Sequence, residues 1–201
     1  APALEALVAA LRDANQSARF QIAKAMDSIG VPDDARMQAW HGMARRDWPA
    51  VVALGAAAID ALAEALTHPD RNVRMSAAEA LGKIGDARGV DPLIGALADV
   101  RGDIRRAASE ALGDIGDPKA VRPLLAALGD SSEHVRRAAA AALAAIGPLA
   151  VVPLIEALKS EEPQVSEAAV DSLGAIGDVR GAKPLMQVLG HRSPHMREKA
   201  A

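Results

Sequence analysis

Histidines are the side chains in this sequence whose spacing could hold a metal ion. His191 and His195 are four residues apart, a spacing that can bind zinc when both residues lie on one face of a helix. Pro194 stands between them, and proline favours the first turn of a helix, so we expect the pair to lie across a helix start. The other three histidines are isolated in the sequence. We therefore predict no metal site.

Nucleophilic and redox chemistry also lack candidates. The chain has no Cys, which excludes disulfides, thiolate metal sites and cysteine nucleophiles. No Ser or Lys stands in a recognisable nucleophile motif, and the glycines are spaced as helix ends with no phosphate-binding loop among them. We predict a protein that is not an enzyme and has no cofactor. The absence of Cys suits a reducing compartment, so we expect a cytoplasmic protein.

Arginine recurs along the chain at a regular spacing. A cation in the first turn of a helix faces the positive end of the helix dipole and needs an acidic partner. Such a row could bind phosphate or carboxylate groups, but we favour a structural ladder in which each Arg pairs with an Asp near it in the sequence. The arginines are Arg19, Arg74, Arg105, Arg136 and Arg197; the first candidate partners are Asp13, Asp99 and Asp130, and the second are Asp86, Asp117 and Asp178.

These residues are positioned by a repeat of 30 or 31 residues. An Ile-Gly pair closes most copies, as at Ile115-Gly116 and Ile146-Gly147. Because each unit of a repeat array packs on its neighbours, the whole chain is expected to form one domain. The predicted domain, 1–201, comprises units 1–30, 56–86, 87–117, 118–147 and 148–178, a partial unit 179–201 and an irregular helix pair at 31–55.

Each unit is predicted to contain two helices, so the fold class is all-α. Positions are counted from the first residue of each unit. Leu at positions seven and eleven, such as Leu93 and Leu97, forms the buried stripe of the first helix. Proline at position six is expected in its first turn. The second helix starts after a capping residue at position fifteen and ends at the glycine of position thirty. Small residues at position twenty-five, such as Ala111, allow a neighbouring helix to approach closely.

The segment 31–55 departs from this pattern. We expect one helix that ends near Arg46 and a shorter one from about Trp48 to Leu54. Trp40 and Trp48 are the only tryptophans of the chain. They either fill extra core space in an irregular unit, which we favour, or form a binding hot spot.

The repeated signature resembles that of a known family. Units with P-L-I-x-A-L in the first helix, V-R-x-A-A-x-A-L in the second and a closing I-G-D are similar to HEAT repeats, in the short form named after phycobilin lyase subunits. The signature residues in one unit are Pro92, Leu93, Ile94, Ala96, Leu97, Ile104, Arg105, Ala107, Ala108, Ala111, Leu112, Ile115, Gly116 and Asp117. The resemblance implies a right-handed α-solenoid of stacked antiparallel helix pairs, whose second helices line a concave surface that binds other macromolecules. It implies no single activity.

Members of this fold that carry out chemistry have features that this chain lacks. Hydroxylases of similar build hold iron through His-Glu pairs, and the sequence contains no His-Glu dipeptide. A DNA-glycosylase branch needs a basic groove, whereas the net charge here is -3. Nothing is carried over from the bilin lyase subunits, because their name describes the repeat and not a catalytic residue.

We therefore predict a non-catalytic scaffold that binds another protein on its concave face. One alternative is an accessory or chaperone subunit of a lyase-type enzyme complex that handles a tetrapyrrole, and a weaker one is nucleic-acid binding. The net charge offers no attraction for nucleic acid or an anionic membrane, and no apolar run approaches the ~20 residues that span a bilayer. No feature predicts a small-molecule ligand.

The predicted binding surface is the outward face of the second helices, at positions seventeen, twenty and twenty-four. We slightly favour a solvated face in which Arg106 pairs with Glu110 at helical spacing, and the alternative is a groove that is apolar at one end, basic in the middle and acidic at the other. The candidate residues are Phe20, Met75, Glu79, Arg106, Glu110, Arg137, Glu167 and Asp171.

The ends of the sequence show no polar cap, which natural arrays normally have. The chain starts at Ala1 without Met and stops at Ala201, partway through the second helix of a unit. This predicts a fragment of a longer protein, or one without its flanking segments.

Overall fold

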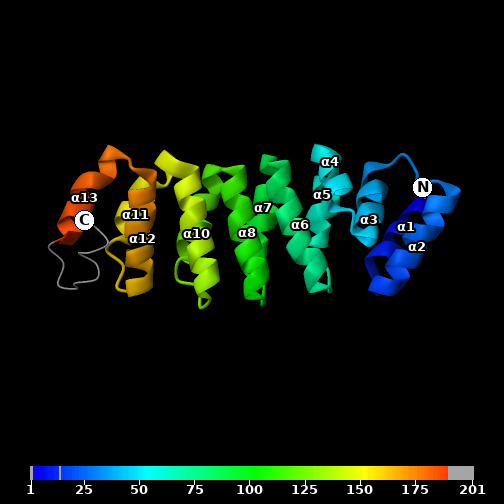
Figure 1. Ribbon diagram of the computed structural model, residues 1–201, viewed down its shortest axis with the longest axis horizontal. Helices are drawn as coiled ribbons and strands as arrows, with labels where there is room; N and C mark the ends of the chain where they lie inside the picture. The colour runs from blue at the N-terminus through cyan, green and yellow to red at the C-terminus, as the bar shows by residue number, and fades with distance from the viewer. Residues whose placement is uncertain (1, 14, 190–201) are drawn as a thin grey trace.

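The fold is known from a computed structural model, which describes residues 2–13 and 15–189 of the chain. Over these residues the chain forms thirteen α-helices and four short 3-10 helices, and no strand. The helices stand in chain order along one elongated row (Figure 1). The predicted all-α solenoid of stacked helix pairs is confirmed.

The second helices of the regular units are alike. Each has 14 residues and ends at the residue before a glycine of positive φ. They are α2 (Gln16–Ile29), α6 (Arg71–Ile84), α8 (Gly102–Ile115), α10 (Glu133–Ile146) and α12 (Pro163–Ile176). Asp70 caps α6 by accepting a hydrogen bond from the Asn72 N–H at 2.9 Å, as the capping pattern predicts. Ser132, in contrast, makes no side-chain cap to α10.

The first helices are shorter and most begin with a 3-10 turn. These pairs are η1 (Gly55–Ala58) with α5 (Ile59–Ala65), η2 (Ala87–Gly89) with α7 (Val90–Ala96), η3 (Pro118–Ala120) with α9 (Val121–Ala127), and η4 (Gly147–Leu149) with α11 (Val151–Ala157). The outer first helices, α1 (Pro2–Asp13) and α13 (Val179–Leu189), are continuous. Pro92 lies in the first turn of α7 as predicted, but Pro184 lies inside α13, because that helix starts five residues before the proline.

The irregular segment forms α3 (Ala35–Arg45) and α4 (Trp48–Ala53). Asp34 caps α3 by accepting the Met37 N–H at 2.8 Å. Arg46 ends the helix with φ 59° and ψ 27°, and it is the one residue other than glycine with positive φ in the described part of the chain. Trp40 is 2% exposed and fills the core, which agrees with the favoured interpretation of that indole.

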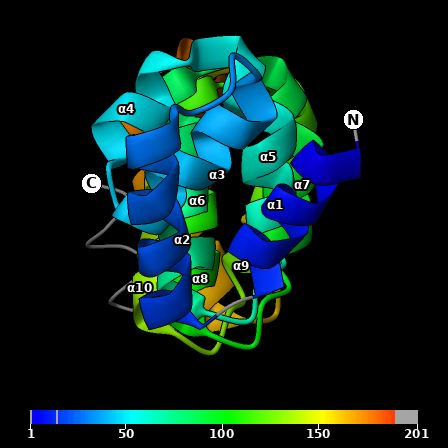
Figure 2. The same cartoon turned by 90° about the vertical axis from the view of Figure 1, so that its right-hand side faces the viewer.

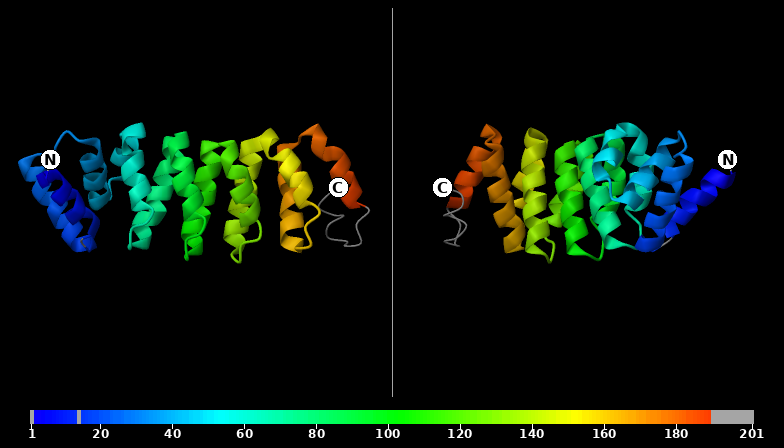
Figure 3. Two further views of the ribbon diagram at one scale, coloured as in Figure 1. Left: turned by 180° about the vertical axis from the view of Figure 1, so that it is seen from behind. Right: turned by 45° about the vertical axis from the view of Figure 1, so that its right-hand side comes forward.

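Two layers result, with the second helices on one side and the first helices on the other (Figure 2). The same row is seen from behind and obliquely in Figure 3. In the middle of the row the second helices touch each other directly, because small residues meet there: a Cβ added at Gly82 or Gly113 would lie 2.8 Å from the Cα atom of Ala111 or Ala142. The first helices make fewer contacts with one another. The second helices in the middle of the row are therefore packed more closely than the first helices.

Candidate protein-binding face

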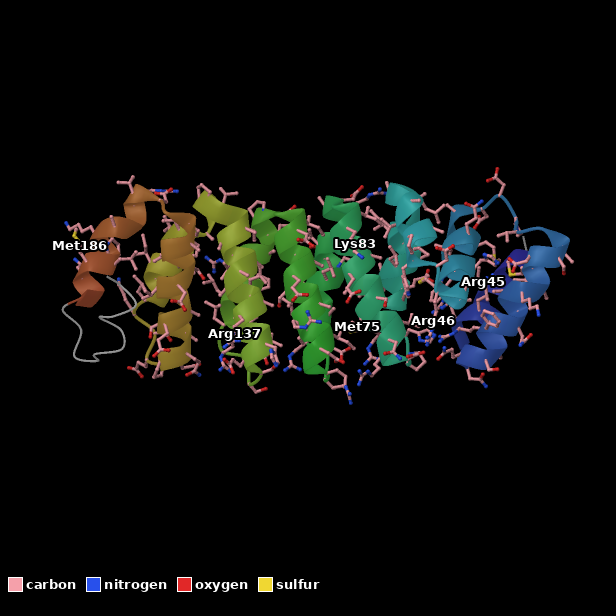
Figure 4. The ribbon with its side chains drawn as sticks, viewed as in Figure 1. Arg45, Arg46, Met75, Lys83, Arg137 and Met186 are labelled. Atoms are coloured by element: carbon pink, nitrogen blue, oxygen red, sulfur yellow. The ribbon has the colours of Figure 1, made fainter. Side chains whose placement is uncertain are left out.

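The predicted binding residues lie on the second helices, on the face that we call the second-helix face: the outward side of α2, α6, α8, α10 and α12. Figure 4 shows Met75, Lys83 and Arg137 along this face. Most of the candidates are exposed, and Met75, Arg106 and Glu167 are half-buried. The candidate set as a whole is thus accessible to a partner.

The charge order on this face differs from the predicted one. Arg106 pairs with Glu110 at 2.6 Å and Arg137 pairs with Glu133 at 2.5 Å, so the middle of the face is balanced in charge. Both pairs join residues four apart on one helix, where opposite charges meet readily. The Arg106–Glu110 pair is the one expected for a solvated face, whereas the basic middle of the alternative groove is not found, because both arginines are paired.

Positive charge lies instead towards the N-terminal half of the face. Lys24, Arg46 and Lys83 are exposed and make no ion pair within the described part of the chain. The predicted apolar end is also partly covered, because the Arg45 guanidinium lies over the Phe20 ring, 5.4 Å from its centroid. The acidic side chains Glu167 and Asp171 are both on α12, towards the opposite end.

The Arg–Asp ladder joins neighbouring units. Arg74 donates to Asp99 at 2.7 Å, and Arg105 donates two hydrogen bonds, each of 2.7 Å, to Asp130. Each aspartate belongs to the unit after that of its arginine, whereas the sequence prediction placed Arg105 beside Asp99. Arg105 reaches Asp99 only at the backbone carbonyl, at 2.8 Å. Arg74 and Arg105 therefore each tie the link between the two helices of their own unit to the corresponding link of the next unit.

The ladder aspartates are largely buried and remain ionised. Burial opposes ionisation of Asp99, but hydrogen bonds from Arg74 and from the Arg101 N–H outweigh it and lower the pKa of that carboxyl group. The Arg105 side chain lowers the pKa of Asp130 against the effect of burial, with help from the Ser132 N–H. These contacts also order the link before each second helix, which explains why Ser132 need not act as a cap.

Other predicted members of the ladder do not belong to it. Asp86 and Asp178 bind Arg88 and Arg180, each two residues further along the chain, at 2.9 and 2.7 Å. The Arg180 side chain lowers the pKa of Asp178 to about 2. Asp117 accepts the Lys119 N–H at 2.8 Å. All three order the 3-10 turn or first helix that follows them.

The remaining predicted residues of the ladder and the histidine pair are untested or incomplete. The side chain of Asp13 and all of Arg197, His191 and His195 lie outside the described residues. Arg136 donates to the Asp130 carbonyl at 2.8 Å, but position thirteen of the next unit is Ser160, so no carboxylate continues the ladder there.

Between the first unit, 1–30, and unit 56–86, His68 stands at the repeat position that holds the ladder aspartate in the later units. Arg19, only 5% exposed, donates to Asp70 at 2.9 Å and lies against the His68 ring. His68 Nδ1 accepts the Asp70 N–H at 3.0 Å, and Nε2 lies 2.7 Å from the Arg12 carbonyl and 2.5 Å from Arg19 Nη1. Burial lowers the pKa of His68, and the Arg19 charge adds to this effect. The position in the repeat was the signal that could have found this contact.

A cavity of about 370 Å³ opens where α2, α3, α4 and α6 meet. Its lining includes Met43, Arg46, Trp48 and Met75. Figure 4 shows Arg46 and Met75 on the same face of the molecule. Nothing in the sequence pattern singles out Arg46, because the position of this residue depends on how the irregular pair separates α2 from α6.

Within the described residues no group of three or more His, Asp or Glu side chains is placed to hold a metal ion. In the same part of the chain no helix is both long enough and apolar enough to cross a membrane.

Comparisons with solved structures show similar folds. The complex of CpcE and CpcF of phycocyanin lyase from Nostoc sp. PCC7120 is 24% identical, with a TM-score of 0.52, and the match covers 98% of this chain and 74% of that one. An engineered protein is 22% identical with a TM-score of 0.52, covering 98% and 95%. A designed armadillo repeat protein in complex with peptide (KR)4 is 17% identical with a TM-score of 0.50, covering 98% and 96%. At these identities the likeness establishes the fold.

Sequence comparison identifies the family. A search of curated proteins finds no match. The family model described as HEAT repeats matches residues 35–112 and 90–153, which together span more than half of the chain, and the model described as PBS lyase HEAT-like repeat matches residues 167–191. With its stacked helix pairs and repeated signature, this chain therefore belongs to the HEAT repeat family.

Proposed function

We propose that this protein is a non-catalytic scaffold that binds another protein along its second-helix face. The observation that carries the proposal is the face itself, on which five helices of equal length present side chains that change from unit to unit. A partner segment laid across the helices would meet a different set of side chains at each step, which permits specific recognition. The designed armadillo repeat protein of similar fold is in complex with a peptide, and this supports the same use of the fold here.

The distribution of charge suggests the orientation of the partner. Lys24, Arg46 and Lys83 give the N-terminal half of the face positive charge without an ion pair in the described part of the chain. An extended or helical segment with acidic residues over α2 and α6 would match this end of the face. Complementary charge of this kind speeds and orients association more than it strengthens the complex.

A second candidate is an accessory or chaperone subunit of a lyase-type enzyme complex that handles a tetrapyrrole. The match of residues 167–191 to the PBS lyase HEAT-like repeat favours it, as does the fold shared with the CpcE and CpcF complex. In this case the protein would still act through a protein partner.

Affinity capture with matched variants tests the proposal. The bait protein is compared with Lys24→Glu/Lys83→Glu, on the second-helix face, and with Arg122→Glu/Lys159→Glu, which changes the net charge equally elsewhere. All four positions are exposed and without an ion pair in the described part of the chain. Circular dichroism checks that both variants fold.

Quantitative mass spectrometry of the captured proteins provides the result. A partner retained by the wild type and by the control variant, but lost from the face variant, supports the scaffold. A captured biliprotein or lyase subunit selects the second candidate. Equal retention by both variants, or capture of nucleic acid alone, contradicts the proposal.

A further inference from the structure

We propose that the cavity between α2, α3, α4 and α6 is an anchor pocket for an apolar side chain flanked by carboxylates in the partner segment. The inference rests on the proposed function, because it states which part of the second-helix face fixes the partner and what chemistry it selects. Four observations carry it: the cause of the cavity, its lining, its charge and its size.

The cavity exists because the irregular pair interrupts the stack. Between α8 and α10 the backbone at Gly113 lies so close to Ala142 that an added Cβ would come within 2.8 Å of its Cα, which leaves no room between the helices. Between α2 and α6 the end of α3 and the start of α4 are inserted instead. The second helices therefore stand apart at this junction, and the cavity of about 370 Å³ opens there.

The wall of the cavity is suited to an apolar side chain. Met43 is buried, and Trp48 and Met75 are half-buried, so each can cover part of a bound group while it packs on the core. Methionine adapts its shape to a ligand, and tryptophan is among the residues that contribute most to binding at protein interfaces. Polar side chains, among them Asn72 and Ser76, complete the lining.

The charge of the lining comes from Arg46. Arg19 and Asp70, which also line the cavity, are paired with each other at 2.9 Å. Arg46 is exposed and has no ion-pair partner within the described part of the chain, and its left-handed backbone is held by N–H bonds to the Gly42 and Met43 carbonyls. An unpaired guanidinium favours a carboxylate next to the apolar group, because it can bind both carboxylate oxygens.

The size of the cavity suits a side chain and its flanking backbone. It lies at the small end of the ~300 to 1,000 Å³ range of ligand sites. A segment such as Glu-Leu-Glu would place its leucine between Trp48 and Met75 and one carboxylate on Arg46. A Lys-Leu-Lys segment would bring a second cation to Arg46 and is therefore disfavoured.

Peptide titration followed by NMR tests this directly on the full chain. The probes are three capped peptides that differ at the centre: Glu-Leu-Glu, Lys-Leu-Lys and Glu-Ala-Glu. The readout is the indole N–H signal of Trp48, assigned by its loss in Trp48→Phe. We expect millimolar binding of the Glu-Leu-Glu peptide, and binding several-fold weaker for each of the other two.

Variants separate the charge from the apolar wall. Arg46→Gln is expected to lower the affinity for the Glu-Leu-Glu peptide by about fivefold, which is the upper end of the effect of an exposed ion pair. The control Arg122→Gln should leave the affinity unchanged. Arg46→Gly also removes the charge, and glycine readily adopts the left-handed backbone of this position, so it tests the charge without loss of folding. Met75→Ala is expected to lower the affinities for the Glu-Leu-Glu and Lys-Leu-Lys peptides by the same factor.

Equal binding of the Glu-Leu-Glu and Lys-Leu-Lys peptides, no effect of Arg46→Gln, or no shift of the Trp48 signal would overturn the anchor pocket. The affinity capture distinguishes this failure from that of the proposed function. If the captured partner depends on Lys24 and Lys83 but is retained in full by Arg46→Gly and Met75→Ala, the scaffold stands and the pocket is refuted.

Discussion

Substituting Gly113 by alanine tests the close contact between α8 and α10. The added Cβ would lie 2.8 Å from the Cα and 2.9 Å from the Cβ of Ala142, whereas carbon atoms pack best at ~3.5 to 4.0 Å. Neither atom belongs to a flexible side chain, so the two helices must separate by up to roughly 1 Å. We expect this to cost about 1 to 3 kcal/mol, as overpacking of a core does.

Helix propensity acts in the opposite direction, because alanine is favoured over glycine inside a helix by about 0.8 to 1.0 kcal/mol. The separation would also lengthen the hydrogen bonds from Arg105 to Asp130, which cross the same joint. The free energy of unfolding should therefore fall by about 1 kcal/mol or somewhat more, since the steric cost exceeds the gain in propensity.

Gly95→Ala is the matched control. Gly95 is exposed in α7, and an added Cβ would meet no atom within 4 Å. Gly95→Ala has the same gain in helix propensity and no steric clash, so this variant should be stabilised by up to about 1 kcal/mol. Urea unfolding of both variants, followed by circular dichroism, gives the two changes. If Gly113→Ala stabilises the protein as much as Gly95→Ala, the close contact of α8 with α10 does not limit the size of the residue at position 113 and the reasoning is refuted.

Three more predictions concern single contacts. Asp130→Asn should lower the free energy of unfolding by about 1 to 2 kcal/mol at neutral pH, because it weakens the two charged hydrogen bonds from Arg105. Because the pKa of Asp130 is lowered in the folded protein, the difference from wild type should begin to shrink as the pH falls below the unfolded pKa of about 4, and it should vanish only below the lowered folded pKa. The contact between α2 and the His68 link should loosen as the pH falls below about 6.5, because burial and Arg19 lower the pKa of His68 and the unfolded state therefore binds the proton first. The loosening should appear as faster hydrogen exchange in α2 after correction for the intrinsic pH effect, and His68→Asp should abolish this pH dependence. Arg46→Gly should raise the free energy of unfolding by about 1 kcal/mol in the same urea assay, because it relieves a left-handed backbone that disfavours other residues; a lower stability would mean that the Arg46 side chain contributes to the fold.

The repeat and its helices follow from the sequence because their signals are local. The cap at Asp34, the left-handed glycine at Gly116 and the buried leucine stripe each depend on residues within one or two turns of the chain. The same locality explains why the pairs of Arg106 with Glu110 and of Arg137 with Glu133 could be expected from spacing alone. The placement of the binding candidates on one face needs only the period of the helix.

Contacts between units depend on how far one helix pair is offset from the next, and that offset is set by packing. Arg105 is nearer in the sequence to Asp99 than to Asp130, yet it binds the carboxylate of Asp130 because the close approach of α8 and α10 brings the next link within reach. The contact of Arg19 with His68 and the cavity beside Arg46 arise in the same way, from an inserted helix pair that keeps α2 and α6 apart. The sequence by itself thus determined which elements form and which side chains share a face. Only the tertiary structure decided which side chains meet between neighbouring units, because the offset between two units is a property of both packed surfaces and of neither helix alone.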